Sequence, residues 1–319
     1  MAPDVAQGFD GRSLRVADYN HMAKRALLLI NTNSRRGHER HDEIVALLRE
    51  RNFELVEEDA PNAQSAKGVM LAQRDNVECV IVGGGDGTLI SMMEGLIESK
   101  LPMGILPLGT FNDLAKTLNV SVDLREACDI IAGGGQLQLD VGWVNGKHFI
   151  NEASIGISTH IARRQTTEVK RRFGFLAIAG TTLQTLRYSR PFHAQIQYDG
   201  KQEGFRTIQL TVANSHHFGG FITNKDAAID DGVLDLYSLE FRHWRQVIPM
   251  VGKLIQQKMS DAQGIRSRRS TGFVVRTTHP RDVFADGEPA TQTPATFKVL
   301  PKAISVFAPG QAQAQFAPS

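Results

Sequence analysis

Short apolar segments alternate with segments of helical periodicity from residue 25 to residue 132. Strands are predicted at residues 25–30, 53–57, 79–82 and 103–106, and helices at residues 41–51, 63–74, 89–98, 112–118 and 123–132. Strands joined through helices run parallel, because each helix returns the chain to the same end of the sheet. The pattern therefore predicts an α/β domain with a doubly wound parallel sheet.

The second half of the chain has short strands separated by polar turns. Strands are predicted at residues 137–144, 147–150, 192–198, 205–214, 233–239, 272–277 and 297–299. Asn145-Gly146 separates the first two, and this dipeptide is the strongest short signal for a hairpin. A chain of 319 residues is also longer than a chain that usually folds around a single hydrophobic core. We therefore expect a mostly antiparallel β-sandwich as a second domain.

A run of glycines stands where the third predicted strand meets its helix. The run consists of Gly83, Gly84, Gly85, Asp86, Gly87 and Thr88. Glycine lets the backbone approach a phosphate, and the free N–H groups of the next helix attract the anion. Asp86 would repel a phosphate unless a divalent cation lay between them or the carboxylate acted on a substrate hydroxyl. Both roles indicate phosphoryl transfer, although a tight strand-to-helix turn requires the same glycines.

The next strand-to-helix connection repeats this pattern. Residues 103–113 comprise a short apolar strand, a turn at Gly109, and the polar residues Thr110 and Asn112. Either polar side chain can cap the following helix or hold a phosphate oxygen. Two such loops on successive strand ends predict one site at the carboxyl edge of the sheet.

These loops and four further motifs resemble the diacylglycerol kinase catalytic domain family, which includes sphingosine, ceramide and bacterial lipid kinases. The further motifs are residues 31–37, 149–156, 227–235 and 285–289. The resemblance implies a first domain similar to those of NAD kinases and phosphofructokinases. It implies a nucleotide-binding domain at 24–136 joined by a returning strand at 303–308, a lipid domain at 137–302, and a nucleotide cleft between them. Residues 1–23 and 309–319 are expected to be flexible extensions.

The resemblance also assigns roles to single residues around the phosphate loop. It implies that Asn33 and Thr110 add hydrogen-bond donors for ATP. Asp59 falls where the family contacts the nucleotide, although a solvated acidic turn is the better explanation of this residue. Glu288 resembles the general base of bacterial relatives and competes with Asp86 for the catalytic role, because a β-turn alone gives Glu288 no task.

Magnesium is the metal that these oxygen-rich motifs favour. By resemblance, a second, structural Mg²⁺ would be held by Asp231 with the backbone carbonyls of Ala228 and Val233, and Asp140 would connect the metal regions through water. The alternatives are a plain turn signal at Asp231 and a hydrogen-bonded structural aspartate at Asp140.

The sequence says less about the residues that would bind the phosphate acceptor. Residues 173–188 carry an apolar stripe of helical spacing, and Arg and Lys residues flank both ends. A core-facing helix gives this pattern, and so does an interfacial element that docks on anionic lipid headgroups. His216-His217 is no obvious zinc site, because adjacent strand side chains point to opposite faces. Asn224 stands where many relatives have proline.

Composition narrows the cellular setting. The net charge of +2 is indecisive, but no Arg/Lys run is interleaved with aromatic residues, so we expect no nucleic-acid partner. Cys79 and Cys128 lie in apolar segments and indicate a reduced cytoplasm rather than a disulfide framework. No apolar stretch approaches the ~18 residues of a membrane span. We expect a cytoplasmic protein, at most peripheral at the inner face of the membrane, and a homodimer stays open.

Three functions remain under consideration. The first is an ATP- and Mg²⁺-dependent lipid kinase acting on diacylglycerol, a sphingoid base, ceramide or a phospholipid. The second is a soluble-metabolite kinase of the NAD kinase type, and the third is a non-catalytic nucleotide sensor. The Pro-Leu-Gly-Thr-Phe-Asn-Asp sequence at 107–113 favours the first by resemblance. The presence of Asp86, Thr110, Asp231 and Glu288 disfavours the third, so we expect a phosphotransferase with an alcohol acceptor.

Overall fold

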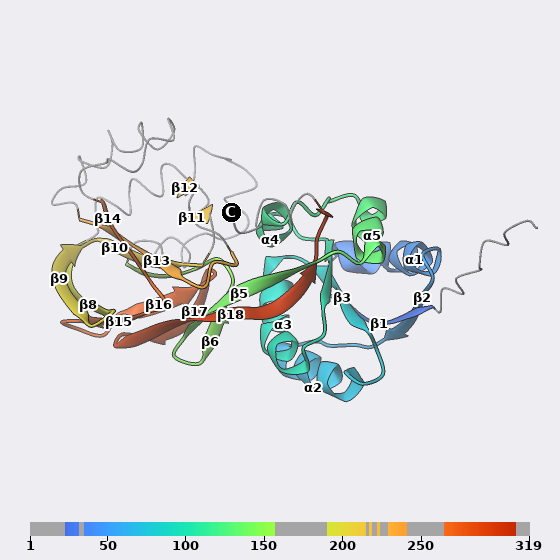
Figure 1. Cartoon of the computed structure of the whole chain (residues 1–319), viewed down its shortest axis with the longest axis horizontal. Helices are drawn as coiled ribbons and strands as arrows, with labels where there is room; N and C mark the ends of the chain where they lie inside the picture. The colour runs from blue at the N-terminus through green and yellow to red at the C-terminus, as the bar shows by residue number, and fades with distance from the viewer. Residues whose placement is uncertain are drawn as a thin grey trace, which may run out of the picture.

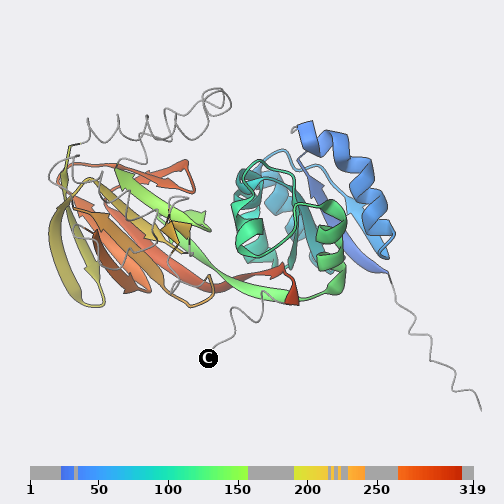
Figure 2. The same cartoon turned by 90° about the horizontal axis from the view of Figure 1, so that it is seen from above.

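The computed structural model describes residues 23–31, 35–156, 190–214, 217–218, 222–223, 229–240 and 265–310. An α/β domain and a β-sandwich stand side by side (Figure 1). The view turned by 90° shows the same two bodies, with a narrow connection between them (Figure 2). The fold class predicted from the sequence is confirmed.

Four parallel strands form the centre of the α/β domain. They are β1 (Lys24–Ile30), β2 (Phe53–Glu57), β3 (Cys79–Gly84) and β4 (Met103–Pro107), in the order β2-β1-β3-β4. Every pairing among them is parallel. Their carboxyl ends therefore meet at one edge of the sheet, as the alternation of strands and helices requires.

Helices cover both faces of this sheet. Their bounds are α1 (Arg35–Arg49), α2 (Ala63–Gln73), α3 (Asp86–Ser99), α4 (Asp113–Thr117) and α5 (Leu124–Gly133). The helices α1 and α5 lie on one face, and α2 and α3 lie on the other (Figure 1). This arrangement buries the central strands β3 and β4 on both sides, which is why they consist wholly of apolar residues, glycine and proline.

Two of these helices begin earlier than their periodicity predicts. The helix α3 begins at Asp86, inside the glycine run, with Gly85 as its N-cap. The helix α1 begins at Arg35, whereas the sequence predicts a start at residue 41. Periodicity locates only the first apolar residue that faces the core, such as Leu89 in α3 and Ile44 in α1. The polar first turns leave no such signal.

A single long strand, β18 (Ala295–Phe307), carries the sheet from one body to the other. It pairs with β4 in parallel, and antiparallel with β5 (Gln136–Val144) and β15 (Gly272–Thr277). Beyond β15 lie β8 (Phe192–Tyr198) and β9 (Lys201–Thr207), and β6 (Lys147–Phe149) pairs with β5, which completes a ten-stranded sheet. The separate strands predicted at 297–299 and 303–308 are thus one strand, whose register shifts between Leu300 and Ile304. The domain boundaries given above stay a prediction.

A second, six-stranded sheet faces this extension and completes the sandwich. Its order is β14 (Ile265–Ser270), β13 (Leu234–Leu239), β10 (Gln209–Ala213), β7 (Glu152–Gly156), β16 (Asp282–Ala285) and β17 (Glu288–Gln292). All its pairings are antiparallel. A short pair, β11 (His217–Phe218) and β12 (Ile222–Thr223), stands apart.

The single strand predicted at 205–214 is wrong. The chain crosses from one sheet to the other at Ile208, so that β9 and β10 belong to different sheets. Thr207 and Ile208 are both buried, which breaks the alternation of a half-buried strand. The Thr207 hydroxyl donates to the Gln209 carbonyl at 2.7 Å and holds this corner.

Each body has its own apolar core. The α/β core contains Leu27, Ile81 and Met93, and the sandwich core contains Phe149, Phe273 and Phe297. Cys79 and Cys128 are buried and free, and burial raises the pKa of the Cys79 thiol to about 12. Within the described part of the chain, no helix combines the length and apolarity needed to cross a bilayer.

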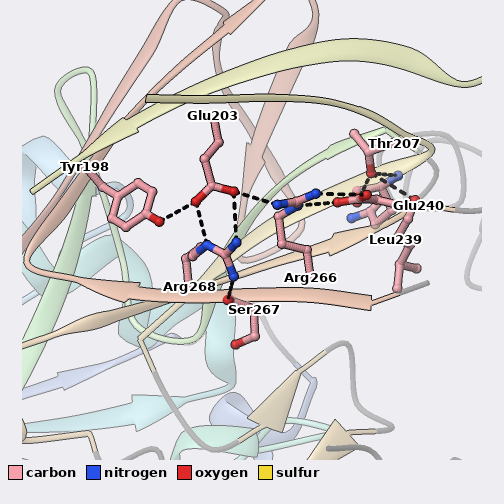
Figure 3. Close-up of polar contacts among 9 residues, drawn as sticks. Tyr198, Glu203, Thr207, Leu239, Glu240, Arg266, Ser267 and Arg268 are labelled. Atoms are coloured by element: carbon pink, nitrogen blue, oxygen red, sulfur yellow. Dashed lines mark hydrogen bonds and ion pairs between the residues drawn. The ribbon is translucent and has the colours of Figure 1, made fainter. Parts of the chain in front are cut away.

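A side-chain network joins the two sheets of the sandwich at one edge (Figure 3). Glu203 on β9 accepts from Arg268 Nε at 2.7 Å and Nη2 at 2.9 Å, and Tyr198 donates its hydroxyl to the same carboxylate. Arg266 donates to both Glu203 and Glu240. The hydrogen bonds from Arg268, followed by that from Tyr198, lower the pKa of Glu203 from 4.5 to about 2. We call Tyr198, Glu203, Glu240, Arg266 and Arg268 the edge clasp.

The edge clasp predicts an acid-dependent loss of stability. Because the pKa of Glu203 is lower in the folded chain, its ionised form stabilises the fold above about pH 4.5, and this contribution disappears as the pH falls toward 2. We expect Glu203→Gln to lower the free energy of unfolding by about 1 kcal/mol at pH 7. The difference from wild type should shrink between pH 4.5 and pH 3, as measured by thermal unfolding. Glu58→Gln, at an exposed position in the α/β domain, is the control; an equal loss in both variants would contradict the role of the edge clasp.

Candidate active site at the glycine loops

The two glycine loops touch each other through their backbones. A β-carbon at Gly109 would lie 2.5 Å from the Gly85 Cα atom, closer than real atoms approach. At Gly84, a β-carbon would lie 2.5 Å from the Thr88 side chain. The loops after β3 and β4 can therefore reach this contact only because both carry glycine. The two loops thus meet, and their use as one binding site stays a prediction.

Asp86 lies between the two loops. It occupies the first turn of α3, where the positive end of the helix dipole favours a carboxylate. Its Oδ1 atom accepts the Leu114 N–H of α4 at 3.3 Å. The carboxylate therefore bridges the first turns of two helices, and it stands beside the free N–H groups that can receive an anion.

Asn112 shapes the second loop instead of facing a ligand. Its Oδ1 accepts the Gly109 N–H at 2.9 Å, and its Nδ2 donates to the Gly109 carbonyl at 3.1 Å. The side chain is buried, with a left-handed backbone at φ 51°. The sequence offers helix capping or phosphate binding for Asn112, whereas the structure shows a clamp on the turn. Thr110, by contrast, is exposed.

Arg36 belongs to this site although the sequence analysis missed it. Its Nη1 atom donates to the Gly109 carbonyl at 2.8 Å, and its side chain is exposed. The guanidinium thus adds a positive charge at the loop contact. The one signal in the sequence was the Arg35-Arg36 pair directly after the first loop, and nothing local connects that pair with Gly109.

A cavity of about 280 Å³ opens beside the phosphate loop. Its lining includes Ile30, Asn31, Asp59, Asn62, Thr88 and Ser91. Asn31 Nδ2 donates to Thr88 Oγ1 at 3.2 Å, which ties the end of β1 to the first turn of α3. The structure therefore places Asp59 and Thr88 on one cavity, close to the size range of ligand pockets.

The β-sandwich contributes the turn between β16 and β17. Asp286 and Gly287 have φ values of 47° and 86°, as a tight hairpin turn requires. The Asp286 carboxylate accepts the N–H groups of Ile150, Asn151 and Glu152 at 2.7, 3.0 and 3.0 Å. This fixes the turn, and Glu288 is exposed directly after it.

The charge of Asp286 links this turn to the glycine loops. Burial raises the pKa of Asp286 to about 6, the three N–H groups oppose the rise, and the nearby negative charge of Asp86 adds to it. The charge of Asp86 thus influences Asp286, and Glu288 follows Asp286 by two residues in the chain. The sequence analysis singled out Glu288 but not the anchoring role of Asp286.

The predicted metal residues lie at a second turn, near the bend of β18. Asp140 is buried and accepts the Gly232 N–H at 2.6 Å and the Lys302 N–H at 2.7 Å. Asp231 accepts the Val233 N–H at 3.2 Å. Burial, followed by the charges of Asp140 and Asp231, raises the pKa of Asp230. Asp140 thus contacts the residue that follows Asp231, and the metal-binding roles of both aspartates stay predictions.

Several predicted features fall outside the described residues. These are Asn33, Ala228, the basic-flanked segment 173–188, His216 and Asn224. Their predicted roles stay predictions.

The geometry fits a polyphosphate that carries a divalent cation. Free N–H groups and the Arg36 guanidinium can neutralise phosphate oxygens, while the Asp86 carboxylate suits the hard cation between them. Glu288 is a further exposed carboxylate, on the β-sandwich, and its role as a proton acceptor stays a prediction.

Comparisons with known proteins agree with this arrangement. Residues 25–144 match the diacylglycerol kinase catalytic domain, and residues 151–308 match the YegS C-terminal NAD kinase beta sandwich-like domain. A "putative lipid kinase" of Staphylococcus haemolyticus is 30% identical over 236 residues, and a diacylglycerol kinase of Bacillus subtilis is 28% identical over 236 residues. These alignments cover 73% of this chain and 77% and 78% of the relatives.

A solved structure shows the same fold. The crystal structure of a "putative diacylglycerol kinase" from Bacillus anthracis superposes with a TM-score of 0.76 and covers 96% of this chain and 100% of that chain. Its sequence identity is 24%, so this likeness supports the fold alone.

The contact between the loops predicts a specific intolerance at Gly109. We expect Gly109→Ala to destabilise the fold by about 2 kcal/mol, because the added methyl group meets rigid backbone. The matched control is Gly68→Ala in α2, where a β-carbon meets nothing within 4 Å and should raise stability by up to about 1 kcal/mol. Thermal unfolding of both variants is the measurement. Equal midpoints would show that the loops do not touch.

Proposed function

This chain belongs to the diacylglycerol kinase catalytic domain family, and on that premise we propose that it transfers the γ-phosphate of ATP to a lipid hydroxyl in a Mg²⁺-dependent reaction. The observation that carries the proposal is the backbone contact of Gly85 with Gly109, which holds Asp86 between the two loops. A site for polyphosphate with a carboxylate at its centre is what phosphoryl transfer needs.

Nucleotide binding would use the α/β domain. The N–H groups at the start of α3 receive the phosphates, and Arg36 adds its charge at Gly109. The cavity beside Thr88 then receives another part of the nucleotide, with Asp59 on its rim.

The residues around Asp86 fit a nucleotide-bound magnesium ion. When bound, Mg²⁺ supplies charge neutralisation for the phosphate oxygens. Asp86 would bind on the side of that cation, and its hydrogen bond from Leu114 keeps the carboxylate aimed between the loops. This fixed orientation avoids the cost of reorganising a flexible side chain during transfer.

Glu288 is the proposed general base. It takes the proton of the lipid hydroxyl while the lipid oxygen bonds to the γ-phosphorus and the bond from phosphorus to the β–γ bridging oxygen breaks, which releases ADP. Asp286 positions the turn through its three backbone hydrogen bonds. Asp86 stays the alternative base.

The acceptor is tested with purified protein, labelled ATP and Mg²⁺. The panel contains diacylglycerol, a sphingoid base, ceramide, phospholipids and NAD. Transfer to one or more lipids supports the proposal and names the substrate class. Transfer to NAD alone, or binding of ATP without transfer to any acceptor, would overturn it in favour of the soluble-metabolite kinase or the sensor.

The two carboxylates should differ from other acidic residues in their effect on turnover. We expect Asp86→Asn to lower kcat by about 10³-fold and Glu288→Gln by about 10²-fold, because each removes charge or proton transfer from the reacting centre. Glu54→Gln, at an exposed position on β2, is the control and should keep wild-type kcat. The rates are measured at saturating ATP, with thermal unfolding to confirm folding. Wild-type activity in Asp86→Asn would refute the site assignment.

A further inference from the structure

The turn at residues 229–233 contains a cation supplied by the chain itself. Asp231 Oδ1 accepts the Val233 N–H at 3.2 Å, and Asp231 Oδ2 accepts a hydrogen bond from Arg269 Nη2. Arg269 lies on β14, directly opposite Asp235 of β13 in the register of the two strands. Its Nε atom is 3.7 Å from Asp235 Oδ1. The guanidinium therefore lies between two carboxylates.

The neighbouring Asp140 is satisfied by backbone donors. Its two oxygens accept the N–H groups of Gly232 and Lys302, and its own N–H donates to the Ile229 carbonyl at 2.8 Å. The carboxylate oxygens of Asp140 and Asp231 are thus all engaged with donors. Mg²⁺ requires oxygen ligands in a near-octahedral shell, and a guanidinium bound to the same carboxylate repels a second cation there.

We propose that the Arg269 guanidinium is the resident cation of this turn, where the resemblance implies a second magnesium ion. A metal ion at Asp231 Oδ2 would have to displace a planar, permanently charged donor that is also held by Asp235. The two carboxylates beside this turn, Asp231 and Asp235, suit a guanidinium.

The Arg269 guanidinium is linked through a series of contacts to β18, the strand that connects the two bodies. Arg269 holds Asp231, and the same turn donates the Gly232 N–H to Asp140. Asp140 in turn holds Lys302, which has a φ of 48° in the irregular part of β18. A continuous series of contacts thus leads from β14 to the strand that joins the bodies. Arg269 is accordingly a positioning residue for this joint.

The test compares stability with and without magnesium in the nucleotide-free full chain. We expect the Tm of the wild type to be the same in millimolar MgCl₂ and in EDTA. Arg269→Gln should lower the Tm by about 2 °C, as expected for the loss of a partly exposed ion pair. Arg269→Lys should keep part of this difference, because it retains the charge but not the planar fork. Arg206→Gln, at an exposed position on β9, is the matched control and should leave the Tm unchanged.

Two results would overturn the proposal. One is a wild-type Tm that falls in EDTA, with the fall absent in Asp231→Asn, since this would place a metal ion at the turn. The other is an equal Tm for Arg269→Gln and Arg206→Gln. Neither ATP nor lipid is present in these measurements, so their outcome is independent of the proposed kinase activity.

Discussion

Backbone pairing between β18 and β5 is the interaction on which the rest of the structure depends. These two strands are the connection that carries one sheet through both bodies, and each end of β18 has a different task (Figures 1 and 2). Its last residues extend the parallel sheet beside β4, and its first residues pair with β15 in the sandwich. Two paired strands, rather than a single flexible linker, therefore connect the body that carries Glu288 with the body that carries Asp86.

Local backbone geometry and contacts between distant segments contribute differently to the proposed active site. Glycine at positions 85 and 109 allows the two loops to meet, and helix geometry directs N–H groups and Asp86 toward the same space. Contacts between distant segments then fix what the loops alone leave free. Asn112 clamps one turn, and Asp286 ties the facing turn to residues 150–152. The arrangement is held before any ligand arrives, which reduces the ordering required on binding.

The sequence predicted those features whose cause is local. Strand and helix alternation gave the parallel sheet, and convergence of strand ends placed the loops at Gly83 and Gly109 together. Arg36 could not be assigned, because its partner lies 73 residues away. The crossing at Ile208 was missed since both flanking segments have strand character, and the position of a strand in one sheet or another is a tertiary property. The edge strand β14 was missed because three arginines hide its pattern.

Those same arginines have a consequence for the behaviour of the protein in a crowded solution. An outer strand normally offers unpaired N–H and C=O groups to any extended chain that meets it, which is how edge-to-edge aggregation begins. At the corner formed by β9 and β14, an added strand would have to desolvate Arg266, Arg268 and the carboxylates that bind them. Desolvating such charges is costly. The edge clasp therefore disfavours the pairing of another chain with these two edge strands, and so disfavours aggregation at this corner.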